Sequence, residues 1–334
     1  MTVPTATVGV SDLVVWSLRG GAGLVLAPLL VVALWTWRGW SRPSAVLVLE
    51  GFQMYVLAPA WGILAAALLS QEWLLAVPAG VVALSHLAFC LPAATRDAVP
   101  RWVAGAPTIS VFVANVRYSN ARYAEVAQLV MEADADVVVL NESTSPLRAA
   151  LDAAGVRDRY EIRVHTEGRP FGELLMARLP ARDAGVEMIG GQRVPAATVA
   201  VGGVELRVHA VHVNAPKSAS RRHLWRRNLD GLGAAAASGT IPALYAGDFN
   251  SAPWHGPFRR LLARRLVDAH DALGRGLSRS WTPDPPWPSW LGPVMRLDHA
   301  LVTDGLHPTS LREVVVSGSD HRGFVVEVAV RTSV

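Results

Sequence analysis

Three long apolar segments constrain the first 95 residues of this chain more strongly than any other feature of the sequence. They cover residues 20–37, 44–69 and 73–92, and Glu50 is the only charged side chain within them. At a rise of about 1.5 Å per residue, a helix over each of them is about long enough to cross a hydrocarbon core of about 30 Å. A cleaved signal peptide fits poorly, because two more apolar segments follow the first at once. The sequence therefore predicts an N-terminal membrane domain, residues 1–95, with three transmembrane helices.

The pattern of the sequence changes after this region. Residues 96–107 contain Pro100, Gly105 and Pro107 and are predicted to form a linker. Beyond them, short apolar segments alternate with amphipathic ones, which is typical of a soluble α/β domain over residues 108–334. The segments expected to form strands are residues 109–116, 136–140, 174–177, 197–201, 204–213, 241–246, 297–302 and 324–330, and those expected to form helices are 121–131, 220–237 and 257–266.

The charge of the chain limits the kind of partner that it binds. The whole formal net charge of +4 belongs to the residues after position 95. An excess this small suits an anionic substrate or a membrane surface. Lys217 is the only lysine, which argues against the broad basic surface of a typical nucleic-acid-binding protein. The single cysteine, Cys90, excludes an intrachain disulfide.

Polar side chains follow the predicted strands at the points where those strands end. The clearest case is Gly247-Asp248-Phe249-Asn250, in which residues two apart on a strand project toward the same face. Taken alone, this sequence is also typical of an ordinary turn. Similar strand ends recur along the chain and carry Asn115, Glu142, His212, Asp298, His299, Asp320 and His321. Carboxylates and imidazoles that converge on one edge of a sheet suit a hard divalent cation and a phosphate group.

In this order, the motifs resemble those of the endonuclease/exonuclease/phosphatase superfamily, which includes DNase I-like nucleases, neutral sphingomyelinases and inositol phosphatases. The resemblance covers residues 108–334 and includes residues 171–180, which are similar to a family segment ending in Ser-Arg-x-Pro, with Ala177 in place of Ser. It implies a DNase I-like fold, a four-layered α/β sandwich of two mixed sheets between helices.

The resemblance also implies roles for individual residues. Glu142 is the expected main ligand of Mg²⁺, with Asn115 close by, and Mn²⁺ suits the same ligands. Asp248 is expected to orient or deprotonate the attacking water. Asn250 is expected to donate a hydrogen bond to the phosphate, and His321 to stabilise the charge that develops on phosphorus. Asp298 is expected to orient the His321 imidazole, and Asp320 to lie beside the metal or the water. His212 is expected to contact the phosphate or to protonate the leaving oxygen. His299 is expected to support these groups from behind.

Residues 208–216 and the basic helix that follows resemble a membrane-bound subgroup that includes the VanJ-type teicoplanin-resistance proteins. Arg222 and Arg226 share a helix face and are predicted to hold a second phosphate or a lipid head group, the alternative being an ordinary solvated helix. Trp254 is predicted to line the pocket, with packing as the alternative. The predicted function is a membrane-anchored, Mg²⁺-dependent hydrolase of a phosphate ester or pyrophosphate in a membrane or cell-envelope lipid.

Two other functions remain open at this point: a membrane-anchored nuclease that binds nucleic acid, and a non-catalytic membrane resistance or binding factor. The orientation is also in conflict. Arg38, Arg42, Arg96 and Arg101 favour a cytoplasmic catalytic domain by the positive-inside tendency. The subgroup resemblance implies a multi-pass cell-membrane protein whose catalytic domain faces outward, and this is the orientation we predict.

Overall fold

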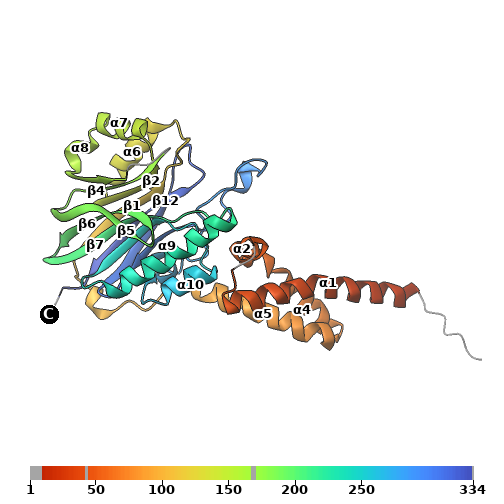
Figure 1. Ribbon diagram of the computed structural model, residues 1–334. Helices are drawn as coiled ribbons and strands as arrows, with labels where there is room; N and C mark the ends of the chain where they lie inside the picture. The colour runs from red at the N-terminus through yellow and green to blue at the C-terminus, as the bar shows by residue number, and fades with distance from the viewer. Residues whose placement is uncertain (1–9, 42–43, 167–170, 333–334) are drawn as a thin grey trace, which may run out of the picture. The chain divides into compact units, whose positions relative to one another are not determined.

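The computed structural model describes residues 10–41, 44–166 and 171–332, and the chain divides into two compact units, Met1–Leu91 and Pro92–Val334 (Figure 1). The helices of the N-terminal unit are α1 (Val10–Arg38), α2 (Ser44–Gly51), α3 (Gln53–Val56), α4 (Pro59–Leu69) and α5 (Trp73–Ala94). Leu29, Leu57 and Val82 belong to the buried apolar cluster that joins α1, α4 and α5 in this unit. Arg42, one of the four arginines used to predict orientation, lies outside the described residues.

Two helices of the N-terminal unit are long and apolar enough to cross a membrane, Arg19–Arg38 and Trp73–Ala94. The predicted central helix over residues 44–69 is not continuous, because Ser44–Gly51 and Gln53–Leu69 are bent by 77° where they meet. Gly51 lies at this break, where a glycine weakens a helix, and the buried polar side chains of Glu50 and Gln53 lie on either side of the break. Pro59 then begins α4, since proline has no N–H to continue a helix through its position. The bent pair is therefore a broken span or a re-entrant segment. The unit thus has two helices of spanning length among the described residues, or three spans if the bent pair counts as one, and the predicted third transmembrane helix stays a prediction.

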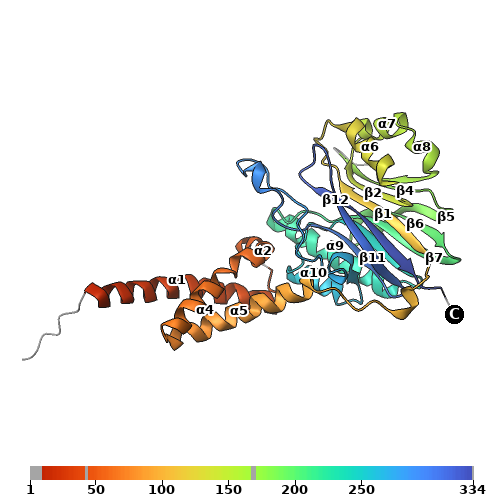
Figure 2. The same cartoon turned by 180° about the vertical axis from the view of Figure 1, so that it is seen from behind.

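The C-terminal unit contains two six-stranded mixed sheets. The first has the strand order β11 (Leu306–Val315), β12 (Arg322–Val330), β1 (Thr108–Asn115), β2 (Val137–Ser143), β4 (Gly172–Ala177) and β3 (Ile162–His165). The second has the order β5 (Ala181–Ile189), β6 (Gln192–Val201), β7 (Val204–His212), β8 (Ala243–Asp248), β10 (Asp298–Val302) and β9 (Val267–Asp268). Figure 2 shows β11 and β12 beside β1 from behind. The eight predicted strands are present, and β3, β5, β9 and β11 were not predicted.

Apolar side chains on both faces of each sheet explain the layering. One buried cluster lies between the two sheets and includes Val111, Val208 and Leu244. A second lies between the first sheet and the helices α6 (Tyr123–Ala133), α7 (Ser145–Ala153) and α8 (Val156–Arg159). The helices α9 (Ala219–Ser238) and α10 (Gly256–Leu262) cover the second sheet (Figure 1). Their side chains Trp225 and Phe258 are fully buried. This arrangement is an α/β sandwich of two sheets between helices, as the sequence predicts.

Residues from Ala93 onward, including the start of the predicted linker, are hydrogen-bonded within the C-terminal unit. The Ala93 carbonyl accepts a hydrogen bond from the Gly276 N–H at 2.7 Å, and the Asp97 N–H donates to the Ala272 carbonyl at 2.9 Å. A Cβ on Gly276 would lie 2.7 Å from the Ala93 Cβ, so this close approach requires glycine. Residues Arg101–Val103 form a short 3₁₀ turn before β1 begins.

Candidate active site

The second sheet brings three of the predicted catalytic residues together through its strand register. Asp248 is the last residue of β8, and His212, at the end of the parallel neighbour β7, is its partner in register. Asp298 is the first residue of β10, which runs antiparallel to β8, and it pairs with Asp248 from the other side. Because the end of one strand meets the start of an antiparallel one at the same edge, all three side chains lie at a single end of the sheet.

The first sheet supplies the facing part of the site. Asn115 ends β1, and its Nδ2 donates to Asp248 Oδ2 at 3.0 Å and to Glu142 Oε1 at 3.3 Å. Glu142 has a positive φ of 59°, a conformation that few non-glycine residues adopt, and its Oε2 accepts the Tyr118 N–H at 2.9 Å. The strand pairing of β2 with β4 is irregular at this point. The irregularity turns the Glu142 carboxylate toward Asn115 and away from the regular ladder.

His321 forms the first of two carboxylate–imidazole pairs in the site. It lies just before β12, and its Nδ1 is 2.8 Å from Asp298 Oδ2, while its Nε2 is 3.9 Å from Asp248 Oδ2. The Ser280 hydroxyl donates to the same Asp298 oxygen at 2.6 Å and accepts the Leu297 N–H at 3.0 Å. The predicted role of Asp298, to orient His321, therefore has a direct geometric basis. Ser280 was missed because no strand-end motif surrounds it.

His212 forms the second pair, with a carboxylate that the sequence did not identify. Its Nδ1 is 2.8 Å from Glu173 Oε1, and its Nε2 is 3.8 Å from Asp248 Oδ2. Glu173 is buried at the start of β4, where it is the only charged residue of the strand Gly-Glu-Leu-Leu-Met-Ala. A lone carboxylate in an otherwise apolar, fully buried strand was the available signal, since a buried charge needs a partner.

Asn141 ties the two sheets together behind these pairs. Its Nδ2 donates to Glu173 Oε2 at 2.8 Å and to the Val211 carbonyl at 2.9 Å, and its Oδ1 accepts the Asp248 N–H at 2.9 Å. Gly247 makes this approach possible, because a Cβ there would lie 2.0 Å from the Val211 carbonyl oxygen and 2.8 Å from Asn141 Oδ1. The glycine before Asp248 is thus needed for the contact between sheets, not only for a turn.

The Asn250 side chain faces the Asp248 carboxylate, as the spacing of the motif predicts. Its Nδ2 is 3.3 Å from Asp248 Oδ2 and donates to the Val213 carbonyl at 2.9 Å, and its backbone N–H donates to Asp248 Oδ1 at 2.7 Å. His299 supports the same loop from behind: its Nε2 is 2.8 Å from the Ser251 carbonyl oxygen, and its Nδ1 is 2.7 Å from Asp268 Oδ2.

Burial and charge in this site shift the pKa values of three groups. Burial, opposed by His321, raises the pKa of Asp248 to about 6. Burial disfavours a charged imidazole, but Glu173 overcomes this and raises the pKa of His212 to about 10. In the same way, Asp298 overcomes the burial of His321 and raises its pKa to about 9. Near neutral pH the site thus presents two imidazolium groups on either side of a carboxylate that readily exchanges a proton.

We expect a bell-shaped dependence of kcat on pH. Asp248 becomes protonated as the pH falls through about 6, which removes a base, and His321 loses its proton as the pH rises through about 9, which removes a positive charge. A divalent cation beside Asp248 stabilises the carboxylate and moves the acid limb lower, so the alkaline limb is the sharper test. Asp298→Asn should move that limb to lower pH, because Asp298 raises the His321 pKa. An alkaline limb that is the same in this variant and the wild type would contradict the assignment.

Two sets of donors around Asp248 suit a divalent cation. The predicted ligands Glu142 and Asn115 form one set, in which a single amide separates the Glu142 and Asp248 carboxylates. Asp248, Asp298 and His321 form the other, with one ligand atom from each lying within 4.8 Å of the others. Asp298 Oδ1 is buried with no hydrogen-bond partner among the residues that the structure describes. Crowded, hard oxygen donors of this kind fit Mg²⁺ or Mn²⁺. Glu142 and Asn115 as the ligands stay a prediction.

The remaining predicted residues lie farther out or inside the protein. Asp320 is on the rim, where its Oδ1 is 3.9 Å from Arg117 Nε. Arg222 and Arg226 are partly exposed on α9, and their contact with substrate stays a prediction. Trp254 is only 6% exposed, so its ring packs within the protein and offers little surface to a ligand. Its predicted place in a pocket lining is therefore not supported by its burial.

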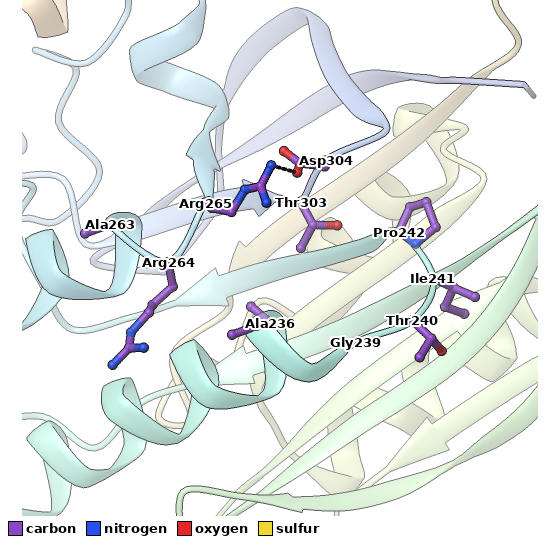
Figure 3. Close-up of a pocket in the computed structure, with 11 residues that line it drawn as sticks. Ala236, Gly239, Thr240, Ile241, Pro242, Ala263, Arg264, Arg265, Thr303 and Asp304 are labelled. Carbon is purple, nitrogen blue, oxygen red and sulfur yellow. Dashed lines mark ion pairs between the residues drawn. The ribbon is translucent and has the colours of Figure 1, made fainter.

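A concavity of about 520 Å³ lies away from these residues (Figure 3). It is formed where α9 and α10 end and where β8 begins, with Pro242 and Thr303 in its wall, whereas Asp248 ends the same strand β8. Arg265 and Asp304 form an exposed ion pair of 2.8 Å at its edge. None of the predicted site residues lines it, so we assign it no part in catalysis.

Comparison with known proteins identifies this arrangement. The sequence profile described as the Endonuclease/Exonuclease/phosphatase family matches residues 112–321, a range that runs from β1 to His321. None of the curated proteins compared with the chain matches it.

Solved structures share the fold at low sequence identity. An endonuclease/exonuclease/phosphatase from Beutenbergia cavernae is 20% identical, with a TM-score of 0.50 over 67% of this chain and 72% of that one. TDP2 from D. rerio, complexed with a single-strand DNA product, is 16% identical, with a TM-score of 0.55 over 66% of this chain and 98% of that one. An endonuclease/exonuclease/phosphatase from Bacteroides vulgatus is 16% identical, with a TM-score of 0.54 over 67% and 99%. These likenesses show the fold alone.

Proposed function

The chain belongs to the endonuclease/exonuclease/phosphatase family, and from that premise we propose that it is a membrane-anchored, Mg²⁺-dependent phosphoesterase acting on a membrane or cell-envelope lipid intermediate. The family relation supports a hydrolase of phosphate esters. One observation carries the reaction: Asp248 lies between His212 and His321, and each imidazole is held by its own carboxylate. That arrangement combines a base with two cationic groups, which is what attack of water on a phosphate requires.

The residues divide the work of in-line hydrolysis among them. The Asp248 carboxylate accepts the proton of the attacking water, and Asn250 donates to a phosphate oxygen. His321 places positive charge where negative charge develops on phosphorus, and Asp298 keeps its Nε2 directed inward by holding Nδ1. His212 contacts the phosphate on the other side or protonates the leaving oxygen. Glu142 and Asn115 would hold Mg²⁺, which would neutralise part of the phosphate charge.

The lipid substrate is inferred from the N-terminal unit. Two helices of membrane-spanning length in the same chain favour a substrate that lies in or near a membrane. The resemblance of residues 208–216 to the VanJ-type subgroup supports an envelope lipid phosphate or pyrophosphate and an outward-facing catalytic domain.

A nuclease is the second candidate function. The D. rerio TDP2 structure, which shares the fold, holds a single-strand DNA product. The chain has one lysine and a net charge of only +4, which is a weak electrostatic basis for binding a nucleic-acid backbone. We therefore place the nuclease behind the lipid phosphoesterase.

The test compares three substrates with purified full-length protein in detergent and Mg²⁺: polyprenyl pyrophosphate, a sphingomyelin-like phospholipid and DNA. Phosphate release from the polyprenyl substrate, lost in Asp248→Asn, is the result that supports the proposal. Cleavage of DNA alone would promote the nuclease. No hydrolysis of any substrate would count against an enzyme with these activities and in favour of a non-catalytic membrane factor.

Glu142→Gln is expected to raise the Mg²⁺ concentration needed for half-maximal activity by at least about 10-fold, because an amide binds a hard cation more weakly than a carboxylate. A titration of activity against Mg²⁺ measures this directly. Glu132→Gln, on the exposed surface of α6, is the matched control and should leave the titration unchanged. An identical titration for Glu142→Gln and wild type would contradict the ligand role.

A further inference from the structure

A hairpin at the edge of the site carries an exposed apolar tip. Residues 281–295, here called the rim hairpin, are closed at their base by backbone hydrogen bonds between Trp281 and Met295. Its tip is the 3₁₀ turn Ser289–Leu291, in which Trp290 is 82% exposed and Leu291 is 42% exposed. Trp290 and Leu291 together form a small apolar surface at the tip of a projecting turn, which a membrane or a partner is able to cover.

The base of the rim hairpin is joined directly to catalytic residues. Trp281 forms a β-bridge with His321, and the Thr282 N–H donates to the Asp320 carbonyl at 2.8 Å. One arm is held by an ion pair of 2.8 Å between Asp284 and Arg117. The rim hairpin is therefore anchored at the candidate active site, and its two arms lead from there to the tip.

The tip has its own internal support. The Trp287 indole N–H donates to the Gly292 carbonyl at 3.3 Å across the hairpin. This contact fixes the turn that contains Trp290 and leaves Trp290 outside the domain. The hairpin is thus an outward projection rather than a cover packed on the sheet.

The helix α5 indicates why a bilayer is the surface that covers the tip of the rim hairpin. The helix α5 has 22 residues and is therefore about 33 Å long, so it crosses a hydrocarbon core of about 30 Å and its last residues reach the interface. Those last residues belong to the C-terminal unit, where the Ala93 carbonyl accepts a hydrogen bond from the Gly276 N–H. The rim hairpin begins five residues after Gly276, within at most about 18 Å of it.

The segment before the hairpin has the charge that suits this position. Arg275, directly before Gly276, and Arg279, two residues before the hairpin base, are both exposed. Arginine near a membrane surface is attracted to anionic lipid head groups, and tryptophan is enriched at the interface itself. The segment before the hairpin is therefore basic, and the tip of the hairpin carries an exposed Trp–Leu pair, a combination that suits an interfacial contact.

We propose that Trp290 and Leu291 insert into the interface of the bilayer that anchors the chain and hold the active-site mouth against the lipid surface. The proposal rests on the membrane anchoring in the proposed function and not on the reaction. It explains how a lipid-linked phosphate reaches Asp248 without leaving the membrane, since the hairpin base adjoins His321.

The contact is tested with a single fluorophore on full-length protein in vesicles of phosphatidylcholine and phosphatidylglycerol. In a Cys90→Ala background, Trp290→Cys and Leu291→Cys each carry an environment-sensitive nitrobenzoxadiazole label. Met188→Cys on β5, 68% exposed in the wild type, is the control position. Quenching by doxyl-labelled lipid should be at least about twofold stronger at positions 290 and 291 than at 188, with the reverse order for aqueous iodide.

Equal iodide quenching at all three positions, or protection that depends on protein concentration and therefore indicates a second copy, would overturn the proposal. A second measurement uses activity. Trp290→Ala should raise KM for a lipid phosphate in vesicles by about fivefold or more and leave hydrolysis of a water-soluble phosphate ester unchanged. Equal loss on both substrates would indicate a structural role instead. If the wild type cleaves neither, the proposed function fails, and the quenching result still decides the contact.

Discussion

We expect Asp248→Asn to lower turnover by at least about 10²-fold, which corresponds to about 2.7 kcal/mol of transition-state stabilisation. The Asp248 carboxylate accepts hydrogen bonds from Asn115 and from the Asn250 backbone, and it faces both imidazoles. An amide in its place has nearly the same shape but no longer accepts a proton from water. The measurement is kcat under saturating substrate, with the substrate that the comparison above identifies.

Thermal unfolding separates this effect from loss of the fold. Asparagine has nearly the same shape as aspartate, so the variant should keep a cooperative melting transition. The melting temperature should change somewhat, because Asp248 is buried between two imidazolium groups. Asp304→Asn, at the exposed ion pair beside the distant concavity, is the matched control and should keep wild-type turnover. A folded Asp248→Asn protein with turnover near that of the wild type would end the assignment of Asp248 as the base.

His321→Ala should lower turnover by a similar factor of at least about 10², because it removes a positive group next to the reacting phosphate. Its Nε2 is 3.9 Å from Asp248 Oδ2, close enough for both to contact one bound phosphate and water. The loss should appear mainly in kcat, since charge stabilisation is needed most in the transition state. The alkaline limb of the pH profile should disappear in the same variant.

His165→Ala, at the exposed end of β3, is the control for His321→Ala and should change neither kcat nor the pH profile. A His321→Ala protein that keeps the alkaline limb near pH 9 would show that another group titrates there. His212, whose pKa is raised to about 10, would then be the group to replace next.

The positions of the candidate site residues were predictable because these residues end strands whose patterns are strong. Asp248, His212 and Asp298 each adjoin a run of apolar residues, and a strand that is buried on both faces must place its first polar residue at an edge of the sheet. Strands β5 and β11 were missed for the converse reason. They lie at the edges of their sheets and carry polar residues on one face, so their patterns are similar to those of loops.

The contacts that support the site were not predictable in the same way. Glu173 is 39 positions from His212, and Asn141 is 107 positions from Asp248. Glu173 lies within residues 171–180 and Asn141 lies beside Glu142, but neither local motif indicates the distant partner. Each side chain acquires its role only when the two sheets pack together. The break near Gly51 was unpredictable for a similar reason. The apolar pattern of residues 44–69 fits one long helix, and only the structure shows the bend and the burial of Glu50 and Gln53 beside it.

The sequence by itself therefore determined the fold class, the family resemblance and the residues placed at strand ends, because strand periodicity and motif order are local properties that survive without a structure. Only the tertiary structure decided which carboxylate holds which imidazole, and that Trp254 is buried while Trp290 is exposed. The physical reason is that burial and hydrogen bonding depend on neighbours distant in sequence. The raised pKa values of Asp248 and His321 follow from burial and from those neighbours.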